Sequence, residues 1–124
     1  MHIGIAGVGR MGEAIGLRLI EKGHTLTVWN RSAGKTEALR KAGATVARTP
    51  AEVARAAEAV ITILTDASAI EAVYGGPDGL LAGDVRGKLF IEMSTVLPET
   101  EVALAPKVRA SGASFVECPV SGST

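Results

Sequence analysis

Residues 2–12 read HIGIAGVGRMG, a short apolar run followed by three glycines in the spacing Gly7-x-Gly9-x-x-Gly12. The apolar run predicts a buried strand at 2–6, and the residues after the glycines follow a helical pattern. In a dinucleotide-binding turn, the first glycine allows the tight turn, the second lets the backbone approach a pyrophosphate, and the third lets the helix pack on the strand. The helix N-terminus would then hold the anion. The stretch predicts a dinucleotide site; a plain strand–helix turn is the alternative.

The rest of the chain repeats this alternation of short apolar runs and amphipathic stretches. Further strands are expected at 25–29, 45–47, 59–64, 88–93 and 114–118, with helices between them. Apolar strands joined by helical crossovers are typical of a parallel sheet covered on both faces. The sequence therefore predicts one domain, residues 1–124, with an α/β, Rossmann-type doubly wound fold and a mostly parallel six-stranded sheet.

Several residues mark where the helices should begin or break. Ser32, Thr49 and Asp66 are expected N-caps, and Glu52 would complete a capping box with Thr49. Pro106 falls inside the last expected helix, where a proline should kink or divide it.

Composition excludes several classes of function. The charges of thirteen basic and thirteen acidic side chains cancel. The chain therefore has no excess of positive charge that would favour a nucleic acid or an anionic membrane as partner. No apolar stretch is long enough to span a bilayer, and the N-terminus lacks the pattern of a signal peptide. The single cysteine, Cys118, excludes an internal disulfide and fits a reducing compartment. We therefore expect a cytoplasmic protein, and we predict no metal site.

The end of the second expected strand should select the nucleotide. Asn30 stands about 20 residues beyond the glycine motif, where an Asp or Glu would bind the ribose 2′-hydroxyl of NAD. Here the carboxylate is absent and Arg31 follows, whose guanidinium can bind two oxygens of a 2′-phosphate. Asn30 and Ser32 can add neutral hydrogen bonds, and Lys35 could add charge. We predict NADP(H) in preference to NAD(H); alternatively, Arg31 is a solvated surface residue.

Three polar segments follow apolar strands at the sheet edge where open parallel sheets bind ligands, namely 64–66, 93–95 and 119–124. We predict that Leu64 and Thr65 contact the cofactor, whereas Asp66 serves as a helix cap. Ser94 and Thr95 could contact the nicotinamide ribose or ring, or form an ordinary turn.

Other reactive side chains are interpreted as structural. His2 begins a strand and His24 lies in a turn, so neither is at a strand C-terminus. Cys118 has no histidine near it in sequence and is expected to be a small buried apolar residue. Glu92 and Glu117 lie near strand ends without an evident paired group. None of these side chains is therefore predicted to act as an acid, a base or a nucleophile.

The segments IGIAGVGRMG, NRS, LTD, MSTV and PVSG, in this order along all 124 residues, resemble the β-hydroxyacid dehydrogenases. That family includes 3-hydroxyisobutyrate dehydrogenase and the glyoxylate and succinic semialdehyde reductases, whose branch the VSGS and NR patterns resemble. By this resemblance the pyrophosphate is held by Gly7, Val8, Gly9, Arg10, Met11 and Gly12. The resemblance also places Thr95 beside the nicotinamide, and Ser121, Gly122 and Ser123 at the carboxylate of a small substrate.

The resemblance further implies what completes the enzyme. The family's catalytic lysine lies on a helix beyond this sheet, and an all-helical second domain closes the cleft and commonly makes a dimer. The chain contains neither, so we expect it to be the cofactor half of a longer, homo-oligomeric enzyme and to be inactive alone. A missing packing partner should leave an apolar patch near 115–124. In the complete enzyme, NADPH would pass a hydride to a small aldehyde-acid. The alternatives are a stand-alone NADP-binding or regulatory module and part of an imine reductase.

Overall fold

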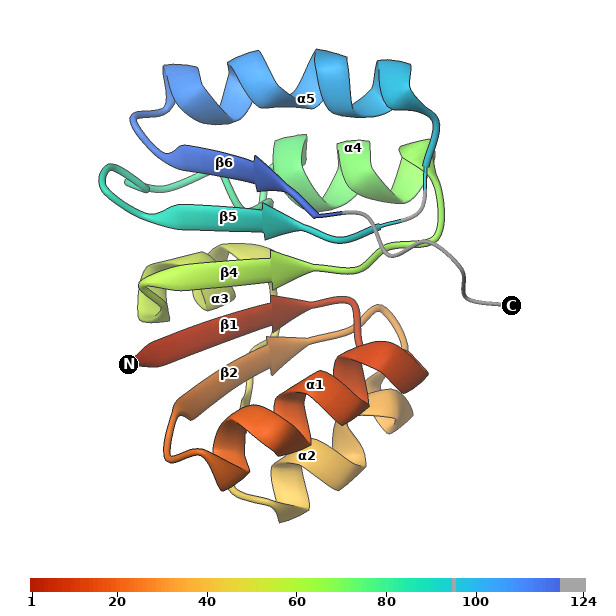
Figure 1. Ribbon diagram of the computed structural model, residues 1–124, viewed down its shortest axis with the longest axis vertical. Coiled ribbons are helices and arrows are strands. Elements are labelled where there is room, and N and C mark those ends of the chain that lie inside the picture. The colour runs from red at the N-terminus through yellow and green to blue at the C-terminus, as the bar shows by residue number, and fades with distance from the viewer. Residues whose placement is uncertain (95, 119–124) are drawn as a thin grey trace.

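The computed structural model describes residues 1–94 and 96–118, apart from the side chain of Ala33. Within these residues, six parallel strands form one sheet in the order β3-β2-β1-β4-β5-β6. Figure 1 shows β2, β1, β4, β5 and β6 side by side in this order. The strands are β1 (His2–Ala6), β2 (Thr25–Trp29), β3 (Thr45–Val46), β4 (Ala59–Thr62), β5 (Leu89–Glu92) and β6 (Ser114–Glu117). The predicted doubly wound α/β fold is confirmed, and its described sheet is wholly parallel.

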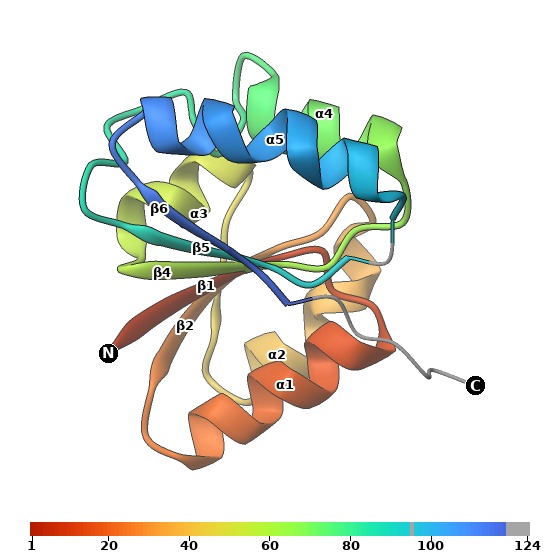
Figure 2. The same cartoon turned by 45° about the horizontal axis from the view of Figure 1, so that its top comes forward.

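Helices cover the sheet on both sides. They are α1 (Arg10–Glu21), α2 (Glu37–Lys41), α3 (Pro50–Ala56), α4 (Ala67–Gly75) and α5 (Pro98–Ala110), with a 3-10 turn, η1 (Ala33–Thr36), before α2. Figure 2 shows α1 and α2 on one face and α3, α4 and α5 on the other. Because β1 pairs with β2 on one side and with β4 on the other, the winding reverses between β1 and β4. In such sheets, ligands bind at the carboxyl ends of the strands beside this reversal.

Two of the three expected helix caps are present. The Thr49 hydroxyl oxygen accepts a hydrogen bond from the Glu52 N–H (3.3 Å), and the Asp66 carboxylate accepts one from the Ala69 N–H (2.8 Å). The expected capping box is altered, because the Glu52 carboxylate binds the Arg48 N–H (2.8 Å) and so reaches one residue before the cap.

The helix cap expected at Ser32 was wrong, and the division of the last helix expected as one outcome at Pro106 is absent. Ser32 makes no side-chain cap, because the chain first enters the 3-10 turn η1 and the α-helix begins only at Glu37. Gly34 and Thr36 in this turn have low helix propensity, which favours the delay. Pro106 does not divide α5, which runs unbroken from Pro98 to Ala110. Pro106 is exposed, so water can reach the carbonyl group that its missing N–H leaves without a partner.

Besides β3, which ends one residue early at Val46, three strands end earlier than expected because the chain turns away to form the loops of the candidate site. The next residue after each still donates one backbone hydrogen bond to the neighbouring strand: Ile63 to Ala6 (3.1 Å), Met93 to Thr62 (2.8 Å) and Cys118 to Glu92 (2.8 Å). The loops therefore begin from fixed points on the sheet.

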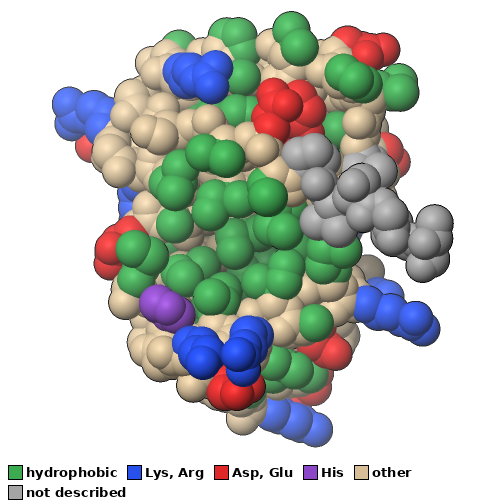
Figure 3. Space-filling view, in the orientation of Figure 1, with side chains coloured by type: hydrophobic (Ala, Val, Ile, Leu, Met, Phe, Trp, Pro, Cys, Tyr) green, Lys and Arg blue, Asp and Glu red, His purple; other side chains and the backbone are tan. Residues whose placement is uncertain are grey.

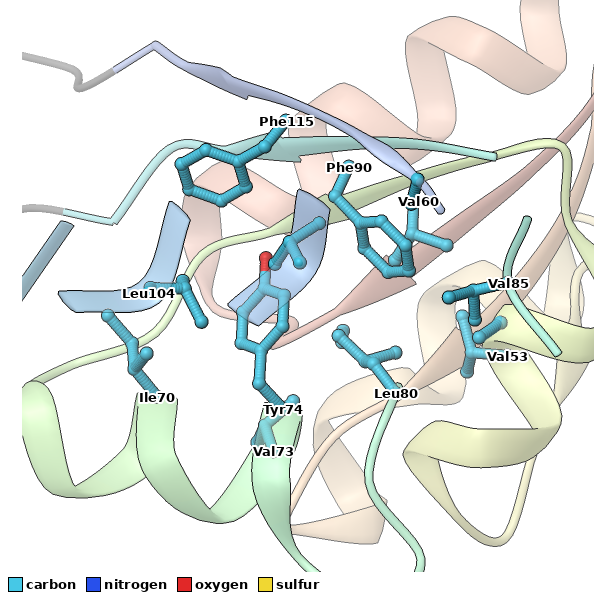
Figure 4. Packing of buried hydrophobic residues seen from close by; sticks show 14 of the residues in the cluster. Val53, Val60, Ile70, Val73, Tyr74, Leu80, Val85, Phe90, Leu104 and Phe115 are labelled. Atoms are coloured by element: carbon cyan, nitrogen blue, oxygen red, sulfur yellow. The ribbon is translucent and has the colours of Figure 1, made fainter. Parts of the chain in front are cut away.

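The larger core lies between the sheet and helices α3, α4 and α5. Figure 4 shows side chains from both layers meeting there, including Val53, Val60, Ile70, Val73, Leu80, Phe90, Leu104 and Phe115. The rings of Tyr74 and Phe90 pack with centroids 5.9 Å apart. A smaller aliphatic core, with Ile5, Val28 and Leu39 fully buried, lies under α1 and α2.

The opposite face of β4, β5 and β6 remains partly open. Phe90 points into the larger core, so by strand alternation its neighbour Ile91 points the other way, in register with Ile61 and Val116. Val116 is 47% exposed, and Figure 3 shows an apolar area on this side of the molecule. This agrees with the apolar patch expected near 115–124, of which residues 119–124 lie outside the described part.

Candidate functional site

The turn after β1 has a backbone path that excludes side chains. Gly7 has φ +98°, and a Cβ atom built on it would overlap the carbonyl oxygen of Ile63. The Gly7 N–H donates to the Trp29 carbonyl (2.9 Å), which fixes the turn against β2. A Cβ atom on Gly12 would lie 2.7 Å from the Gly7 carbonyl oxygen. The first and third glycines therefore have the steric roles that the dinucleotide fingerprint assigns to them.

Gly9 lies at the mouth of this turn. Among the described residues, no atom comes within 4 Å of a Cβ atom built on Gly9, so a side chain there would fill open space instead of the core. Gly9 is also the N-cap of α1 and supplies no side-chain cap to the first-turn N–H groups. An uncapped helix N-terminus beside an open glycine is a fitting cradle for a pyrophosphate. Arg10 is exposed and Met11 half-buried at the same end of α1.

Asn30 connects the glycine turn with the loop after β2. Its Oδ1 accepts a hydrogen bond from the Val8 N–H (2.7 Å), and its Nδ2 donates to the Ser32 carbonyl (3.0 Å). The Val8 side chain is buried in the smaller core, so both its N–H and its side chain are engaged within the protein. Sequence reasoning assigned Asn30 to the ligand and missed this bridge. The residue type could have indicated this bridge, because an Asn side-chain amide can accept a hydrogen bond from one loop and donate one to another.

The cations predicted to read a 2′-phosphate lie beside this bridge. Arg31, Ser32 and Lys35 are exposed. Within the described part of the chain, the ion pairs are Arg18–Glu21, Arg40–Glu37 and Arg86–Asp84, so Arg31 and Lys35 are not neutralised by an ion pair there.

On the other side of the winding reversal, a buried carboxylate joins the ends of β4 and β5. Glu92 is 0% exposed. Its Oε1 accepts a hydrogen bond from the Ser94 N–H (2.7 Å), and its Oε2 accepts one from the Thr62 hydroxyl (2.7 Å). The Ser94 hydroxyl oxygen in turn accepts from the Leu64 N–H (2.6 Å). Glu92 is thus structural, as predicted, but it has specific partners that the sequence did not reveal.

Tyr74 extends this network from α4. Its hydroxyl oxygen lies 2.7 Å from the Thr62 hydroxyl oxygen. Because the single Thr62 proton goes to Glu92, the Tyr74 hydroxyl must be the donor in this pair. Burial, and then the negative charge of Glu92, raise the pKa of Tyr74 well above its ordinary value, so the phenol keeps the proton that it donates. Figure 4 shows Tyr74 reaching from α4 into the core.

A second acidic side chain lies near this network. Glu101, on α5, is only 7% exposed, and its Oε2 has no hydrogen-bond partner among the described residues. Burial, and then the charges of Glu92 and Glu117, raise the pKa of Glu101 to about 7. The carboxyl group of Glu101 is therefore partly protonated at neutral pH.

Of the remaining predicted site residues, two lie within the described part of the chain and four lie outside it. Leu64 is half-buried beside the glycine turn, where its Cδ2 would lie 3.0 Å from a Cβ atom on Gly7, and Thr65 is exposed. Thr95, Ser121, Gly122 and Ser123 lie outside the described residues.

Two further expectations concern residues away from the turn. Cys118 is exposed, so its expected burial was wrong; it follows β6, the edge strand, with no strand beyond it in the described sheet. His2 begins β1 as expected, and its ring nitrogens lie 2.6 Å from the hydroxyl oxygens of Thr25 and Thr27, which supports a structural role.

The described residues contain no group of three or more His, Cys, Asp or Glu side chains placed to hold a metal ion. None of their helices is long and apolar enough to cross a membrane.

Comparison with known proteins agrees with the geometry of the turn. The family model described as the NAD binding domain of 6-phosphogluconate dehydrogenase matches residues 2–124. Glyoxylate/succinic semialdehyde reductase 1 of Arabidopsis thaliana is 39% identical over 123 residues, which are 99% of this chain and 43% of that protein. The cytokine-like nuclear factor N-PAC of Danio rerio is 41% identical over 122 residues, 98% of this chain and 26% of that protein.

A solved structure of Psf3 in complex with NADP+ and 2-OPP superposes with a TM-score of 0.88 at 35% identity, covering 97% of this chain and 43% of that one. The chain thus spans less than half the length of each of these relatives. It belongs to the family of the NAD-binding domain of 6-phosphogluconate dehydrogenase, as an NAD(P)-binding domain of the β-hydroxyacid dehydrogenase type.

Proposed function

We propose that this chain binds NADP(H) in preference to NAD(H) and forms the cofactor half of a reductase of small aldehyde-acids. The substrates would be of the glyoxylate, succinic semialdehyde or 3-hydroxyisobutyrate type, with the matching hydroxyacids as products. The observation that carries the proposal is the turn after β1, in which Gly7 has φ +98° and Gly9 faces open space. Such a turn admits a pyrophosphate at the N-terminus of α1.

The chain's own residues would bind and orient the cofactor, which supplies the hydride when bound. Gly9 and the first turn of α1 would hold the pyrophosphate, with Gly7 and Gly12 shaping the turn. Asn30 would act indirectly, because its amide holds the Val8 N–H against the loop after β2. No step of the reaction is assigned to an acid or base of this chain.

The preference for NADP(H) is supported by the charges at the end of β2. Arg31 and Lys35 are exposed and unpaired within the described residues, and no carboxylate stands at Asn30 to repel a 2′-phosphate. Psf3, a relative of known structure at 35% identity, was solved in complex with NADP+.

The substrate side of the proposal rests on the relationship to glyoxylate/succinic semialdehyde reductase 1. Ser121, Gly122 and Ser123 would contact the substrate carboxylate, and Thr95 would lie by the nicotinamide. We also propose that the whole protein is a cytoplasmic homo-oligomer without a nucleic-acid or membrane partner. The partly open apolar face around Ile91 and Val116 is consistent with a packing partner there.

A second candidate is a nucleotide-binding module without catalysis of its own. It is favoured by the 41% identity to a protein named as a nuclear factor, of which this domain covers 26%. Turnover of glyoxylate and succinic semialdehyde by the whole protein distinguishes the two, because a non-catalytic module would bind NADPH and oxidise none of it.

Calorimetric titration of the chain with NADPH and with NADH tests the cofactor assignment directly. We expect NADPH to bind more tightly by about tenfold or more, the usual scale of one charge-assisted phosphate contact. Equal affinities would remove the NADP preference, and binding of neither nucleotide would contradict the proposed function of the chain.

A further inference from the structure

We infer that Glu92 is a positioning residue for the nicotinamide half of the site, because its buried carboxylate holds the loops after β4 and β5 in the arrangement that receives that half. The inference rests on the proposed dinucleotide binding and adds to it a residue that does not contact the ligand itself.

The hydrogen bonds of Glu92 show how one side chain controls two loops. Each of its oxygens is used, Oε1 by the Ser94 N–H after β5 and Oε2 by the Thr62 hydroxyl at the end of β4. The Ser94 hydroxyl, placed by the first of these bonds, accepts from the Leu64 N–H at 2.6 Å. Removing the carboxylate would therefore loosen the loop after β5 directly and the loop after β4 through Ser94.

The position of these loops assigns them to the nicotinamide half. The loop after β4 lies against the glycine turn, since a Cβ atom on Gly7 would meet Ile63 and Leu64. Asn30 ties the other side of that turn to the loop after β2, where the adenosine ribose is read. A dinucleotide whose pyrophosphate sits at the turn must then extend its other half over the ends of β4 and β5.

Burial distinguishes Glu92 from a residue retained only to fill the core. It points to the same side of β5 as Phe90, into a layer that is otherwise largely apolar. A buried carboxylate is costly unless donors satisfy it, and a well-packed apolar side chain is often at least as stabilising. What an apolar side chain could not do is hold the Ser94 N–H and the Thr62 hydroxyl at fixed places.

Three variants separate positioning from general stability. E92A removes both acceptors. E92Q keeps an oxygen for the Ser94 N–H, and the Thr62 hydroxyl can reverse, accepting from the new amide and donating to Tyr74, so E92Q is the rescuing substitution. Y74F is the matched control, because it removes one hydroxyl from the same network but leaves both bonds of Glu92 intact.

The readout compares a whole dinucleotide with its adenosine half. Calorimetry uses the dinucleotide that binds wild type more tightly, together with the nucleotide that represents its adenosine half. This nucleotide is 2′,5′-ADP for NADPH and 5′-AMP for NADH. In E92A we expect dinucleotide affinity to fall about tenfold while affinity for the adenosine half stays within about twofold. E92Q should recover most of the loss, and Y74F should keep the wild-type ratio.

Several results would overturn the inference. In E92A, the ratio of the affinity for the whole dinucleotide to the affinity for its adenosine half could stay unchanged, whether neither affinity falls or both fall equally. In Y74F, the affinity for the dinucleotide could fall as much as it does in E92A. If E92A does not fold, S94A carries the test, because it cuts the link between the loops and leaves the carboxylate in place; an unchanged ratio there is equally decisive. If wild type binds the adenosine half and the whole dinucleotide with equal affinity, this inference alone is contradicted. If wild type binds neither ligand, the proposed function is contradicted as well.

Discussion

The two sides of the candidate site are held in shape by different means. On the β1–β2 side, the backbone conformation at Gly7 and Gly12 fixes the shape of the turn, and the Asn30 side-chain amide links it to the next loop. On the β4–β5 side, hydrogen bonds of a buried carboxylate and of the Thr62 and Ser94 hydroxyls hold the loops. The glycines of the first side lie close together in sequence, whereas the Val8–Asn30 hydrogen bond spans 22 residues and the Thr62–Glu92 hydrogen bond spans 30. The first side should therefore fail through backbone strain, and the second through unpaired polar groups.

Substitution G7A should have the largest effect. Alanine at φ +98° is strained, and its methyl group would overlap the Ile63 carbonyl, so we expect a loss of about 3 kcal/mol in the free energy of unfolding and loss of dinucleotide binding. Gly23 is the matched control, since it has φ +93° with no described atom within 4 Å of its Cβ position. G23A should cost only about 1 kcal/mol in urea denaturation. Equal costs for the two variants would show that the contact with Ile63 is unimportant.

Substitution T62V tests the β4–β5 side at nearly constant volume. It leaves Glu92 Oε2 without its donor and the Tyr74 hydroxyl without its acceptor, so we expect a loss of about 2–3 kcal/mol in the free energy of unfolding. Y74F removes one donor and should cost about 1 kcal/mol. In the T62V background the cost of Y74F should vanish, because the bond it removes is already gone. Additive costs in this double-mutant cycle would show that the hydrogen bond between the two hydroxyls does not stabilise the fold.

This contrast also explains how much the sequence could predict. The fold and the glycine turn could be read from local patterns, since a strand, three spaced glycines and a helix lie within 20 residues at the N-terminus. Glu92 was recognised as structural, but its partners were not, because nothing local to β5 indicates that the Thr62 hydroxyl lies beside it. Asn30 shows the same limit, since its bond to the Val8 N–H crosses from one strand end to another.

Small errors in the elements have similar causes. Ser32 has the residue type of a helix cap, but the loop conformation and the weak helix formers after it decide against that role. Pro106 does not divide α5, because exposure of that residue, which the sequence pattern does not show, lets water replace the lost hydrogen bond.

The acidic groups beside the β4–β5 side should make stability depend on pH. The pKa of Glu101 is raised from 4.5 to about 7, so the folded state binds its proton more tightly than the unfolded chain. The stability that this tighter proton binding gives the folded state is fully present below the pKa of Glu101 in the unfolded chain, 4.5. It is lost as the pH rises through the folded-state pKa of about 7. E101Q, which carries no titrating group, should therefore be more stable than wild type by about 2 kcal/mol at about pH 8, with a smaller difference at about pH 5.

Urea denaturation across this pH range measures the effect. Glu99 is an exposed carboxylate in the same part of α5, so E99Q is the control for loss of a charge near the helix N-terminus. E99Q should keep the wild-type decline in stability with rising pH. Parallel curves for E101Q and wild type would show that the Glu101 carboxyl group is not held protonated by its surroundings.

The smallest effect is expected at the surface of the β1–β2 side, where charge rather than backbone shape is tested. R31A should weaken NADPH binding about tenfold and leave NADH binding unchanged, because only the 2′-phosphate would lose a partner. R18A, which removes an exposed arginine paired with Glu21 at 2.8 Å, controls for the loss of one positive charge. The affinities should converge at high salt, since an exposed contact is screened. If R31A weakens both nucleotides equally, Arg31 acts on a part of the cofactor that NADPH and NADH share, and the selectivity must come from other residues of the loop after β2.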